Sequence, residues 1–409
     1  MTYQPVFITG MFRSGTTLLA RMLQAHSKAC CAVDPYIPLF KEFRNDVASN
    51  LVPGYTVDPE APLDDYYYYP EKQSVLKAIQ QTSFDLTKDQ SEMPNLRKRI
   101  AHFLRPISPK IEPFLDQLNG CNYVELIDSG FDIVQKAYGQ TTSHTVGFKV
   151  TWAGEFANHI LESFPEAKVI HVMRDPRAIC ASKNSQQSVQ EKYPWLFLIR
   201  QWRKLATLAW QSVYKSPNTS DRVLLLKYEQ LVSDPEMEAK KVCDFLNMNF
   251  DPSMIDPNTF VDGTGSKWSQ NSSYQNFQAT RSFNLDSIDR WKNALTSPEI
   301  QFIEHLCYPE MEIFGYQPDI ASTSRVPLSL MFDSPEVDVK DLATWIRPYS
   351  QVNGESKVSD ISLELLRSSI LHSSQPVPDS IQKAFFLDTD FFEVIRQSVS
   401  ISNRELASK

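Results

Sequence analysis

The chain has 409 residues, of which 42% are hydrophobic and 22% are charged, and these proportions are typical of a globular protein rather than a disordered or fibrous one. Its net charge of −8 at pH 7 argues against a general nucleic-acid-binding protein, because such proteins present a basic surface. An anion-binding site in this chain would therefore have to concentrate its positive charge locally.

The N-terminal segment predicts a strand, a glycine-containing loop and a helix. The apolar run Val6–Thr9 ends at Gly10, and a second glycine follows at Gly15. After Gly15, apolar residues at positions 18, 19, 22 and 23 recur at helical spacing. The loop between the two glycines is thus expected to join the end of a strand to the start of a helix.

The middle of the chain repeats this alternation of strand and helix. The expected strands are Thr145–Val150, Ala167–Met173 and Arg222–Lys227, and the expected helices are Phe156–Phe164, a segment from Pro176 through Ser182 and beyond, Trp195–Tyr214 and Asp234–Leu246. Strands that alternate with helices favour right-handed crossovers and a mostly parallel sheet that is covered on both faces. The sequence therefore predicts an α/β fold, with a P-loop-type parallel sheet flanked by helices.

Two regions interrupt the alternation. Residues 35–120 contain many prolines and the aromatic run Tyr66–Tyr69, and they predict a helical and loop insertion. Residues 318–409 form an extension with two helix-like segments, Ile361–Leu371 and Ile381–Val399. The second segment carries four phenylalanines and is too apolar to lie in water, so it is expected to pack on the main domain or on a partner.

The predicted organisation is a main domain over residues 1–317, which contains the insertion, and a mainly helical C-terminal extension over residues 318–409. The extension is a candidate contact for a homo-oligomer. The insertion is expected to shape a binding pocket, because long insertions beside a regular scaffold often carry specificity. Tyr66–Tyr69 would either line an aromatic site there or pack in the core.

The loop from Gly10 to Thr17 combines the features of a phosphate site. Backbone N–H groups of such a loop point at a phosphate, and the helix that follows adds the partial positive charge of its N-terminus. The G-x4-G spacing is that of a nucleotide P-loop, but Thr16 stands where that loop has its lysine. Arg13 and the neighbouring hydroxyl groups suit a single 5′-phosphate without a metal ion.

The run Phe12-Arg-Ser-Gly-Thr-Thr-Leu18 resembles the first motif of the sulfotransferases that use 3′-phosphoadenosine 5′-phosphosulfate (PAPS). That motif reads P-R-S-G-T-T-L before a helix, so this chain differs from it at Phe12 alone. Within the family, the chain is most similar to the tyrosylprotein and bacterial-type branch. The resemblance implies that the loop residues bind the 5′-phosphosulfate: Arg13, Ser14, Gly15, Thr16 and Thr17. It also implies a catalytic role for Arg13.

A second motif of the same family is a strand that ends in an arginine, then D-x-R, then a serine eight positions after the first arginine. Arg174-Asp-Pro-Arg177 follows the expected strand, and Ser182 stands at the required position. By resemblance, Arg174 and Ser182 hold the 3′-phosphate. Taken alone, the run is equally typical of a capped helix start.

Lys149 corresponds by resemblance to the catalytic lysine that this branch carries before the second motif, 25 positions ahead of Arg174. The family surrounds that lysine with D-P or T-P, whereas Val150-Thr151-Trp152 follow here. The alternative interpretation is a solvated lysine at the end of a strand.

The resemblance also implies a general base at Asp34. In tyrosylprotein sulfotransferases a glutamate twenty-one positions after the loop arginine has this role, and the same count from Arg13 reaches Asp34, which has a shorter side chain. An Asx-turn before Pro35 is an equally good interpretation of Asp34. His26 is the second candidate base, although its position on the first helix favours a packed histidine.

Three later segments extend the resemblance. Tyr228-Glu-Gln-Leu matches a family Y-E-x-L segment whose tyrosine lies near the nucleotide. The segments around Ser273 and Arg290 resemble the loop that closes over the nucleotide, so Ser273, Arg290 and Arg281 are candidate contacts of the 3′-phosphate.

The resemblance implies in-line transfer of a sulfuryl group from PAPS to a small-molecule or peptide acceptor that carries a hydroxyl group, without a metal ion. A P-loop kinase is a weaker alternative, because G-K-[ST] is absent. A catalytically silent protein that binds PAPS, with Asp34 in a structural role, is the other alternative.

The six cysteines form no C-x-x-C pair, and their apolar surroundings predict reduced, buried thiols. The N-terminus lacks the basic flank and apolar core of a signal peptide. No stretch approaches the roughly 20 apolar residues of a membrane span. Together these features predict a cytoplasmic protein.

Overall fold

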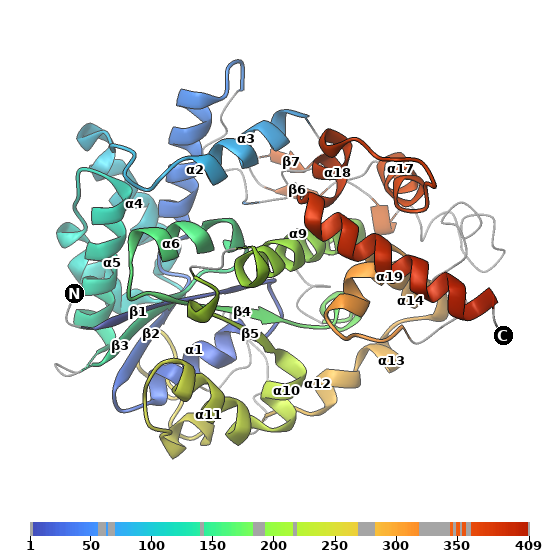
Figure 1. The fold of residues 1–409 in the computed structure, drawn as a ribbon. Coiled ribbons are helices and arrows are strands. Elements are labelled where there is room, and N and C mark those ends of the chain that lie inside the picture. Colours follow the sequence, from blue (N-terminus) through green and yellow to red (C-terminus); the bar gives the residue numbers. More distant parts are fainter. Residues whose placement is uncertain are drawn as a thin grey trace. The chain divides into compact units, whose positions relative to one another are not determined.

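The computed structural model describes residues 3–55, 63, 70–139, 143–182, 193–215, 219–268, 283–318, 344–346, 349–351, 354–356 and 361–407. Figure 1 shows the chain in sequence colours. The chain divides into two compact units. Unit 1 contains Met1–Leu63, Lys77–Met173 and Ser212–Leu285, and unit 2 contains Asp64–Leu76, Arg174–Gln211 and Asp286–Lys409. Each unit is described separately below.

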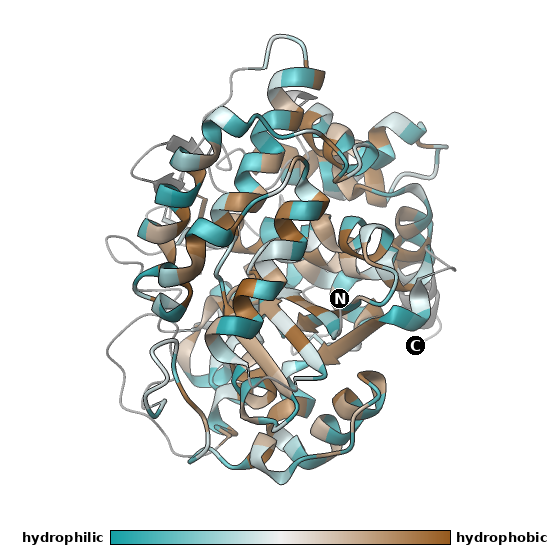
Figure 2. Ribbon diagram, turned by 90° about the vertical axis from the view of Figure 1, so that its left-hand side faces the viewer, coloured by the Kyte–Doolittle hydropathy of each residue, from teal (hydrophilic) through white to brown (hydrophobic). Residues whose placement is uncertain are grey.

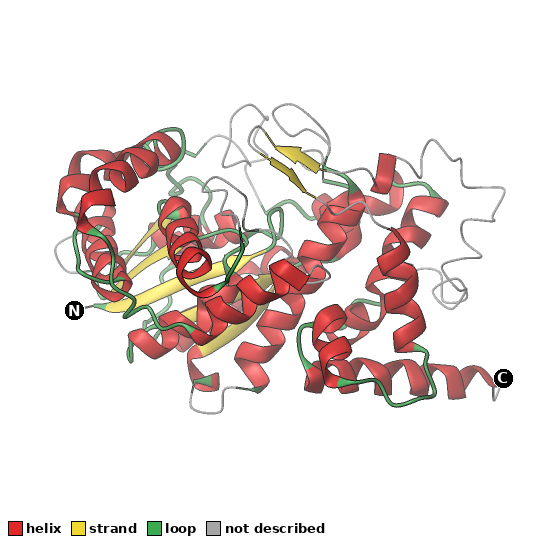
Figure 3. Ribbon diagram, turned by 90° about the horizontal axis from the view of Figure 1, so that it is seen from above, coloured by secondary structure: helices red, strands yellow, loops and turns green. Residues whose placement is uncertain are grey.

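Within the described residues, unit 1 is built on a five-stranded parallel sheet in the order β2-β3-β1-β4-β5. Figure 3 draws the strands of this sheet in yellow, among the helices that surround it. The strands are β1 Gln4–Gly10, β2 Ala29–Val33, β3 Thr145–Lys149, β4 Lys168–Met173 and β5 Val223–Lys227. All four pairings are parallel, so the carboxyl ends of the strands meet at one edge of the sheet. The predicted α/β fold is confirmed.

The two faces of the sheet have different cores because successive strand residues point to opposite sides. Val6 and Ile8 of β1 join an aliphatic cluster with Leu19 of helix α1. Phe7, between them, packs on the other face, with its ring 5.8 Å from that of Phe40 and 5.9 Å from that of Phe148. Figure 2 shows apolar residues along the strands, in keeping with a sheet that is covered on both sides.

The helices of unit 1 are α1 Thr16–Ala25, α2 Ile37–Leu51, α4 Met93–Leu104, α5 Tyr123–Tyr138, α6 Ala157–Ser163, α10 Tyr228–Ser233 and α11 Pro235–Phe245. Its short 3₁₀ segments are η1 Gln90–Glu92, η2 Pro109–Gln117, η3 Gly154–Phe156, η4 Ser220–Arg222 and η5 Pro252–Ile255. Helix α1 lies on one face of the sheet and α6 on the other (Figure 1). Helices α3 Pro70–Gln81 and α9 Trp195–Tyr214 each have residues in both units.

Where it is described, the insertion consists of helices joined by turns and loops, as predicted. Helices α2 and α4 pack together, and an ionic network reinforces this region: Lys88 lies 2.7 Å from Glu42 and 3.1 Å from Asp46. Arg99 of α4 also pairs with Glu42. The run Tyr66–Tyr69 lies outside the described residues.

The helix after β4 is shorter than expected. Helix α7 covers Pro176–Cys180, and Ser182 lies beyond its end rather than inside it. The N–H of Ser182 donates to the carbonyl of Ile179 at 3.2 Å, which is the tight turn typical of a helix C-terminus. The position predicted for Ser182 inside a helix is therefore wrong.

Within its described residues, unit 2 contains α7, most of α9 and further helices. These include α12 Asp286–Asp289, α13 Trp291–Ala294, α14 Ser297–Ile313, α17 Ile361–Leu371, α18 Asp379–Phe386 and α19 Thr389–Ala407. Two short antiparallel strands, β6 Tyr349–Gln351 and β7 Gly354–Ser356, were not expected from the sequence. Helix α17 has the predicted bounds.

The expected helix Ile381–Val399 is two helices, α18 and α19. Leu387 adopts a left-handed conformation with φ 64°, and the side chain of Asp388 accepts a hydrogen bond from the N–H of Phe391 at 2.9 Å. A left-handed residue followed by a capping aspartate ends one helix and starts the next. The ring centroids of Phe386 and Phe392 lie 4.7 Å apart across this break, and α19 packs on α14.

Five of the six cysteines are buried and all six are free, but Cys121 is exposed, so the expectation of six buried thiols is wrong there. Cys121 precedes α5, and its N–H donates to Glu125 at 2.7 Å in an exposed turn. In the part of the chain that the structure describes, no helix is both long enough and apolar enough to cross a membrane.

Candidate functional site

The loop after β1 is compact and has unusual backbone angles. Gly15 stands at the N-cap of α1 with φ 89°, and Arg13 has φ 74°. A Cβ atom on Gly15 would lie 2.2 Å from Cδ2 of Tyr228, so no larger residue fits without movement. Tyr228 begins α10 directly after β5, and the fold thus brings it against the loop.

The N-terminus of α1 has no side-chain cap. The hydroxyl and N–H of Ser14 both donate to the carbonyl of Met11, which closes the loop on itself, and Ser14 is buried. Gly15 offers no side-chain cap, and no acidic residue lies in the first turn of α1. Thr16 is buried, whereas Arg13 and Thr17 are partly exposed.

Asp34 and Lys149 form a buried ion pair at the carboxyl edge of the sheet. Asp34 directly follows β2, Lys149 ends β3, and Oδ2 of Asp34 lies 2.5 Å from Nζ of Lys149. The side chains are only 5% and 3% exposed, so Lys149 is not a solvated lysine. Asp34 adopts φ 46°, and its N–H donates to the carbonyl of Lys149 at 2.7 Å. Its carboxylate pairs across strands and does not form a local Asx-turn.

Thr151 is a partner of this pair that sequence reasoning missed. Its N–H donates to Oδ1 of Asp34 at 2.9 Å, and its hydroxyl donates to the same oxygen at 3.1 Å. Nothing in the sequence distinguishes Thr151 except its position two residues after Lys149. Its role follows from the register of β2 beside β3, in which Val33 is paired with Lys149.

Both acidic and basic side chains act on the pKa of Lys149. Burial lowers the pKa of Lys149, and the charges of Arg13 and Arg21 lower it further, while Asp34 opposes these effects. Arg21 lies on α1, and burial lowers its pKa too. Its Nε is buried without a hydrogen-bond partner. Arg13 and Arg21 thus add positive charge near Lys149, and added positive charge favours the binding of an anion.

An aromatic pair links the loop to the segment after β3. The ring of Phe12 meets that of Trp152 edge to face, with centroids 5.3 Å apart. Trp152 has φ 65°, and its N–H donates to the carbonyl of Gly10 at 3.2 Å. Arg13, Asp34 and Trp152 are thus three non-glycine residues with left-handed backbones at this edge, and such strain often accompanies functional sites.

His26 is packed, as its position on the first helix suggested. Its Nε2 lies 3.0 Å from the carbonyl of Asn249, and its Nδ1 accepts a hydrogen bond from the N–H of Lys28 at 2.9 Å. Both ring nitrogens therefore have backbone partners, which gives His26 a structural role at the end of α1.

Unit 2 contains Arg174, Ser182 and Arg290. Arg174 is buried, its Nη2 donates to the carbonyl of Ser287 at 2.6 Å, and its own carbonyl accepts from Nε1 of Trp202 at 2.8 Å. Ser182 is buried just past α7, and Arg290 is a partly exposed residue at the N-cap of α13. Ser273 and Arg281 lie outside the described residues.

The second arginine of the R-D-P-R run has a structural role. Asp175 caps α7 by accepting the N–H of Arg177 at 2.8 Å, as the helix-cap interpretation predicts. The guanidinium of Arg177 bonds to Asp175 and Glu304 and lies 3.9 Å from the ring centroid of Trp291. This buried network fixes the backbone directly after Arg174.

A family model described as the sulfotransferase family matches residues 5–252, which is more than half of the chain. The chain belongs to the sulfotransferase family.

Named relatives of this sulfotransferase-family chain are distant. Carbohydrate sulfotransferase 3 of Tetronarce californica is 26% identical over 199 residues, which cover 43% of this chain and 43% of that protein. The protein-tyrosine sulfotransferase of Drosophila melanogaster is 22% identical over 166 residues, which cover 40% of this chain and 33% of that protein. The matched regions thus span less than half of the length of either relative.

Among solved structures, the sulfotransferase domain of the olefin synthase of Synechococcus is similar, with a TM-score of 0.43 and 16% identity over 77% of this chain and 96% of that domain. The family match includes the loop, Asp34, Lys149, Arg174 and Tyr228, whereas Arg290 and the C-terminal extension lie beyond it.

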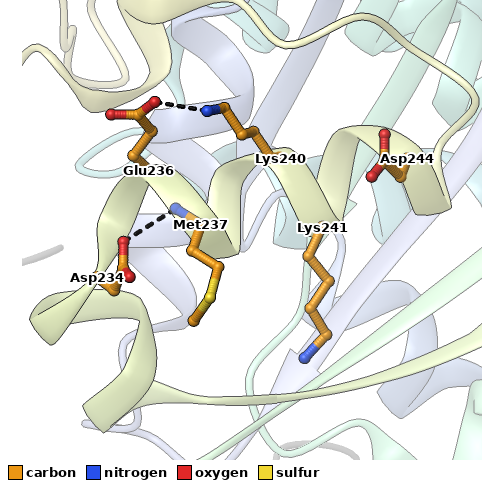
Figure 4. Close-up of a pocket in the computed structure, with 6 residues that line it drawn as sticks. All are labelled: Asp234, Glu236, Met237, Lys240, Lys241 and Asp244. Atoms are coloured by element: carbon orange, nitrogen blue, oxygen red, sulfur yellow. Dashed lines mark hydrogen bonds and ion pairs between the residues drawn. The ribbon is translucent and has the colours of Figure 1, made fainter.

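A hollow on α11 has none of the predicted site residues in its lining (Figure 4). It is lined by Asp234, Glu236, Met237, Lys240, Lys241 and Asp244. Glu236 and Lys240 pair at 2.6 Å one helical turn apart, as is usual on a solvated helix face. Among the described residues, no group of three or more His, Cys, Asp or Glu is arranged to hold a metal ion.

Proposed function

We propose that this sulfotransferase-family chain is an enzyme that moves a sulfuryl group from PAPS to a hydroxyl group of an acceptor. The observation that carries the proposal is the buried pair of Asp34 and Lys149, placed at the carboxyl edge of the sheet where α/β proteins gather their ligands. A carboxylate beside a cation of lowered pKa is a suitable combination of general base and charge stabiliser.

The loop residues fit the phosphosulfate end of PAPS. Gly15 leaves no room for a side chain beneath Tyr228, and the N-terminus of α1 has neither a cap nor an acid in its first turn. An anion there is favoured by the helix dipole and by the guanidinium of Arg13. We assign the 5′ end to Arg13, Ser14, Gly15, Thr16 and Thr17, with Ser14 acting through the shape of the loop.

PAPS supplies the sulfuryl group, and the chain's residues position it and stabilise charge. Asp34 accepts the proton of the acceptor hydroxyl as the acceptor oxygen bonds to sulfur. Arg13 and Lys149 stabilise the negative charge that gathers on the bridging oxygen as its bond to sulfur breaks. No metal ion enters this proposal. We assign the 3′-phosphate to Arg174, Ser182, Ser273 and Arg290, and nucleotide contacts to Tyr228.

We also propose an organisation for the rest of the chain. The main domain covers residues 1–317, residues 35–120 shape the pocket for a small-molecule or peptide acceptor, and residues 318–409 form the extension that a homo-oligomer would use. The free thiols of its six cysteines suit a reducing compartment such as the cytoplasm.

The donor is tested by thermal unfolding with and without 3′-phosphoadenosine 5′-phosphate (PAP), beside ATP·Mg²⁺ and ADP. PAP at 100 times its Kd should stabilise the protein by about 2.7 kcal/mol. Arg174→Ala should remove this stabilisation, and Arg105→Ala should not, because Arg105 is an exposed arginine paired with Glu112. Stabilisation by ATP·Mg²⁺ alone would contradict the proposal and would indicate a kinase instead.

Transfer is tested separately by following PAP release from PAPS with pooled hydroxyl acceptors. PAP binding without any release would identify a silent PAPS-binding protein, in which the buried Asp34–Lys149 pair only stabilises the fold.

A further inference from the structure

The two oxygens of the Asp34 carboxylate have different partners. Oδ1 accepts two hydrogen bonds from Thr151, one from the N–H at 2.9 Å and one from the hydroxyl at 3.1 Å. Oδ2 faces Nζ of Lys149 at 2.5 Å, and the Thr151 hydroxyl is farther from it, at 3.4 Å. A carboxylate oxygen has two lone-pair directions, so Oδ1 is filled and Oδ2 keeps one for a further partner.

The backbone holds Asp34 in a matching orientation. Its φ of 46° is uncommon for a residue other than glycine, and its N–H is anchored on the carbonyl of Lys149 at 2.7 Å. Because Val33 and Lys149 are register partners in β2 and β3, Thr151 and Asp34 leave neighbouring strands side by side. Thr151 therefore fixes the rotation of a short carboxylate whose backbone is already fixed.

We propose that Thr151 is a positioning residue that occupies Oδ1 of Asp34 and leaves Oδ2, beside Lys149, as the oxygen that accepts the acceptor's proton. This inference rests on the proposed function. In the step, the acceptor O–H bond breaks and its proton goes to Oδ2, while the acceptor oxygen bonds to sulfur. The bond from sulfur to the bridging oxygen breaks, and its electron pair stays on the 5′-phosphate of PAP.

The arrangement places proton acceptance next to the ammonium group. Lys149 is buried together with Asp34, so a proton that reaches Oδ2 weakens the ion pair at the moment when negative charge develops on the leaving phosphate. The ammonium is then available to that charge. A carboxylate that rotated freely would not present the same oxygen to the acceptor in each turnover.

The test compares Thr151→Val, which removes the hydroxyl and keeps the N–H, with Thr151→Ser, which keeps both donors. Thr145→Val is the matched control, because Thr145 is a buried threonine on β3 whose hydroxyl faces the sulfur of Met248. We expect Thr151→Val to lower kcat about 10- to 100-fold with KM within about two-fold, since a hydrogen bond to a charged group is lost. The serine variant and the control should stay within about three-fold.

The pH profile separates positioning from a structural effect. In Thr151→Val the acidic limb of the kcat profile should move to higher pH, because hydrogen bonds to a carboxylate favour its charged form. An unmoved limb, an equal shift in Thr145→Val or a failure of serine to restore the profile would overturn the proposal.

A readout without activity keeps the inference distinct from the proposed function. The carboxylate of Asp34 is observed by NMR at one pH with ¹³C-labelled aspartate, and its signal is assigned with Asp34→Asn. The chemical shift of this carboxylate should change in Thr151→Val but not in Thr145→Val, because only the first variant loses the hydroxyl bond to Oδ1. If the wild type transfers no sulfuryl group, the proposed function fails, and an unchanged chemical shift in Thr151→Val would show in addition that Thr151 does not control Asp34.

Discussion

Two buried ionic clusters, one in each unit, have opposite electrostatic characters. In unit 2, Glu364 of α17 is fully buried and contacts Arg200 at 2.6 Å and Arg203 at 2.8 Å, both on α9. These two cations hold the pKa of Glu364 well below its usual range although burial opposes them. In unit 1, burial lowers the pKa of Lys149 despite its contact with Asp34.

This difference distinguishes the Glu364 cluster, which stabilises the fold, from the Asp34–Lys149 pair, which is a candidate reactive pair. Glu364 is stabilised in its charged form and joins two regular helices. A bound ligand would therefore add little electrostatic stabilisation to its cluster. Burial lowers the pKa of Lys149, its partner has a left-handed backbone, and Arg13 and Arg21 add positive charge. The added positive charge favours an incoming anion, which is the arrangement expected of a binding site.

The largest effect should come from removing the acid of the structural cluster. Glu364→Ala leaves two buried cations without their carboxylate, and we expect it to lower the free energy of unfolding by about 5 kcal/mol. Urea denaturation measures this loss. Glu236→Ala, which breaks an exposed pair on α11, is the control and should cost less than about 1 kcal/mol. Similar losses in the two variants would contradict the comparison.

The pair in unit 1 should behave differently when both partners change. Lys149→Met leaves Asp34 buried with only its Thr151 donors, and we expect a loss of about 3 kcal/mol. Asp34→Asn/Lys149→Met should recover part of this loss, because no unpaired charge remains and asparagine tolerates the left-handed backbone. A double variant that is less stable than Lys149→Met would show that the pair mainly stabilises the fold.

A third prediction concerns pH and a buried histidine of the sheet. Burial lowers the pKa of His171 on β4 from 6.5 to about 4. Between these two pH values His171 is protonated in the unfolded chain and neutral in the folded chain, so protons favour the unfolded state. Stability should therefore fall as the pH drops from 6.5 towards 4, by roughly 2 kcal/mol between pH 6.5 and pH 5.

Urea denaturation of wild type and His171→Leu at pH 7 and pH 5 checks this effect. The difference between the two pH values should shrink in the variant, and what remains should include His159, whose pKa burial also lowers. An unchanged difference would mean that His171 is not shielded from protons.

The smallest effect is expected in unit 2, at the break between α18 and α19. Leu387 has φ 64°, a conformation that glycine adopts without steric cost. Leu387→Gly should therefore be about 1 kcal/mol more stable than Leu387→Ala, since both lose the leucine side chain and only glycine relieves the backbone. Thermal unfolding of the two variants measures the difference. An alanine variant of equal stability would mean that the break is unstrained.

The sheet could be predicted from the sequence because its strands are nearly continuous apolar runs between turn residues. The expected strands and α9 agree with the structure to within two residues at each end. The break at Leu387 escaped prediction because the segments on both sides share one helical apolar pattern. The strands β6 and β7 are each three residues long, which is too short for a pattern to develop.

The candidate site could be predicted from the sequence only in part. Asp34 was named from a family pattern, and Lys149 was named because that pattern coincides with the end of an expected strand. Thr151 and Arg21 were not, because their roles depend on strand register and on the packing of α1. The backbone angles of Arg13, Asp34 and Trp152 follow from the packing of the sheet edge, which local sequence does not encode.

The most direct test of the account is the rate of PAP release from PAPS, with pooled hydroxyl acceptors, in wild type and Asp34→Asn/Lys149→Met. Thermal unfolding and PAP titration should first show that the variant is folded and binds PAP. We expect the wild type to release PAP in an acceptor-dependent manner and the variant to be slower by about 10³-fold. Equal rates in two folded, PAP-binding proteins would show that the buried pair is not the reactive centre.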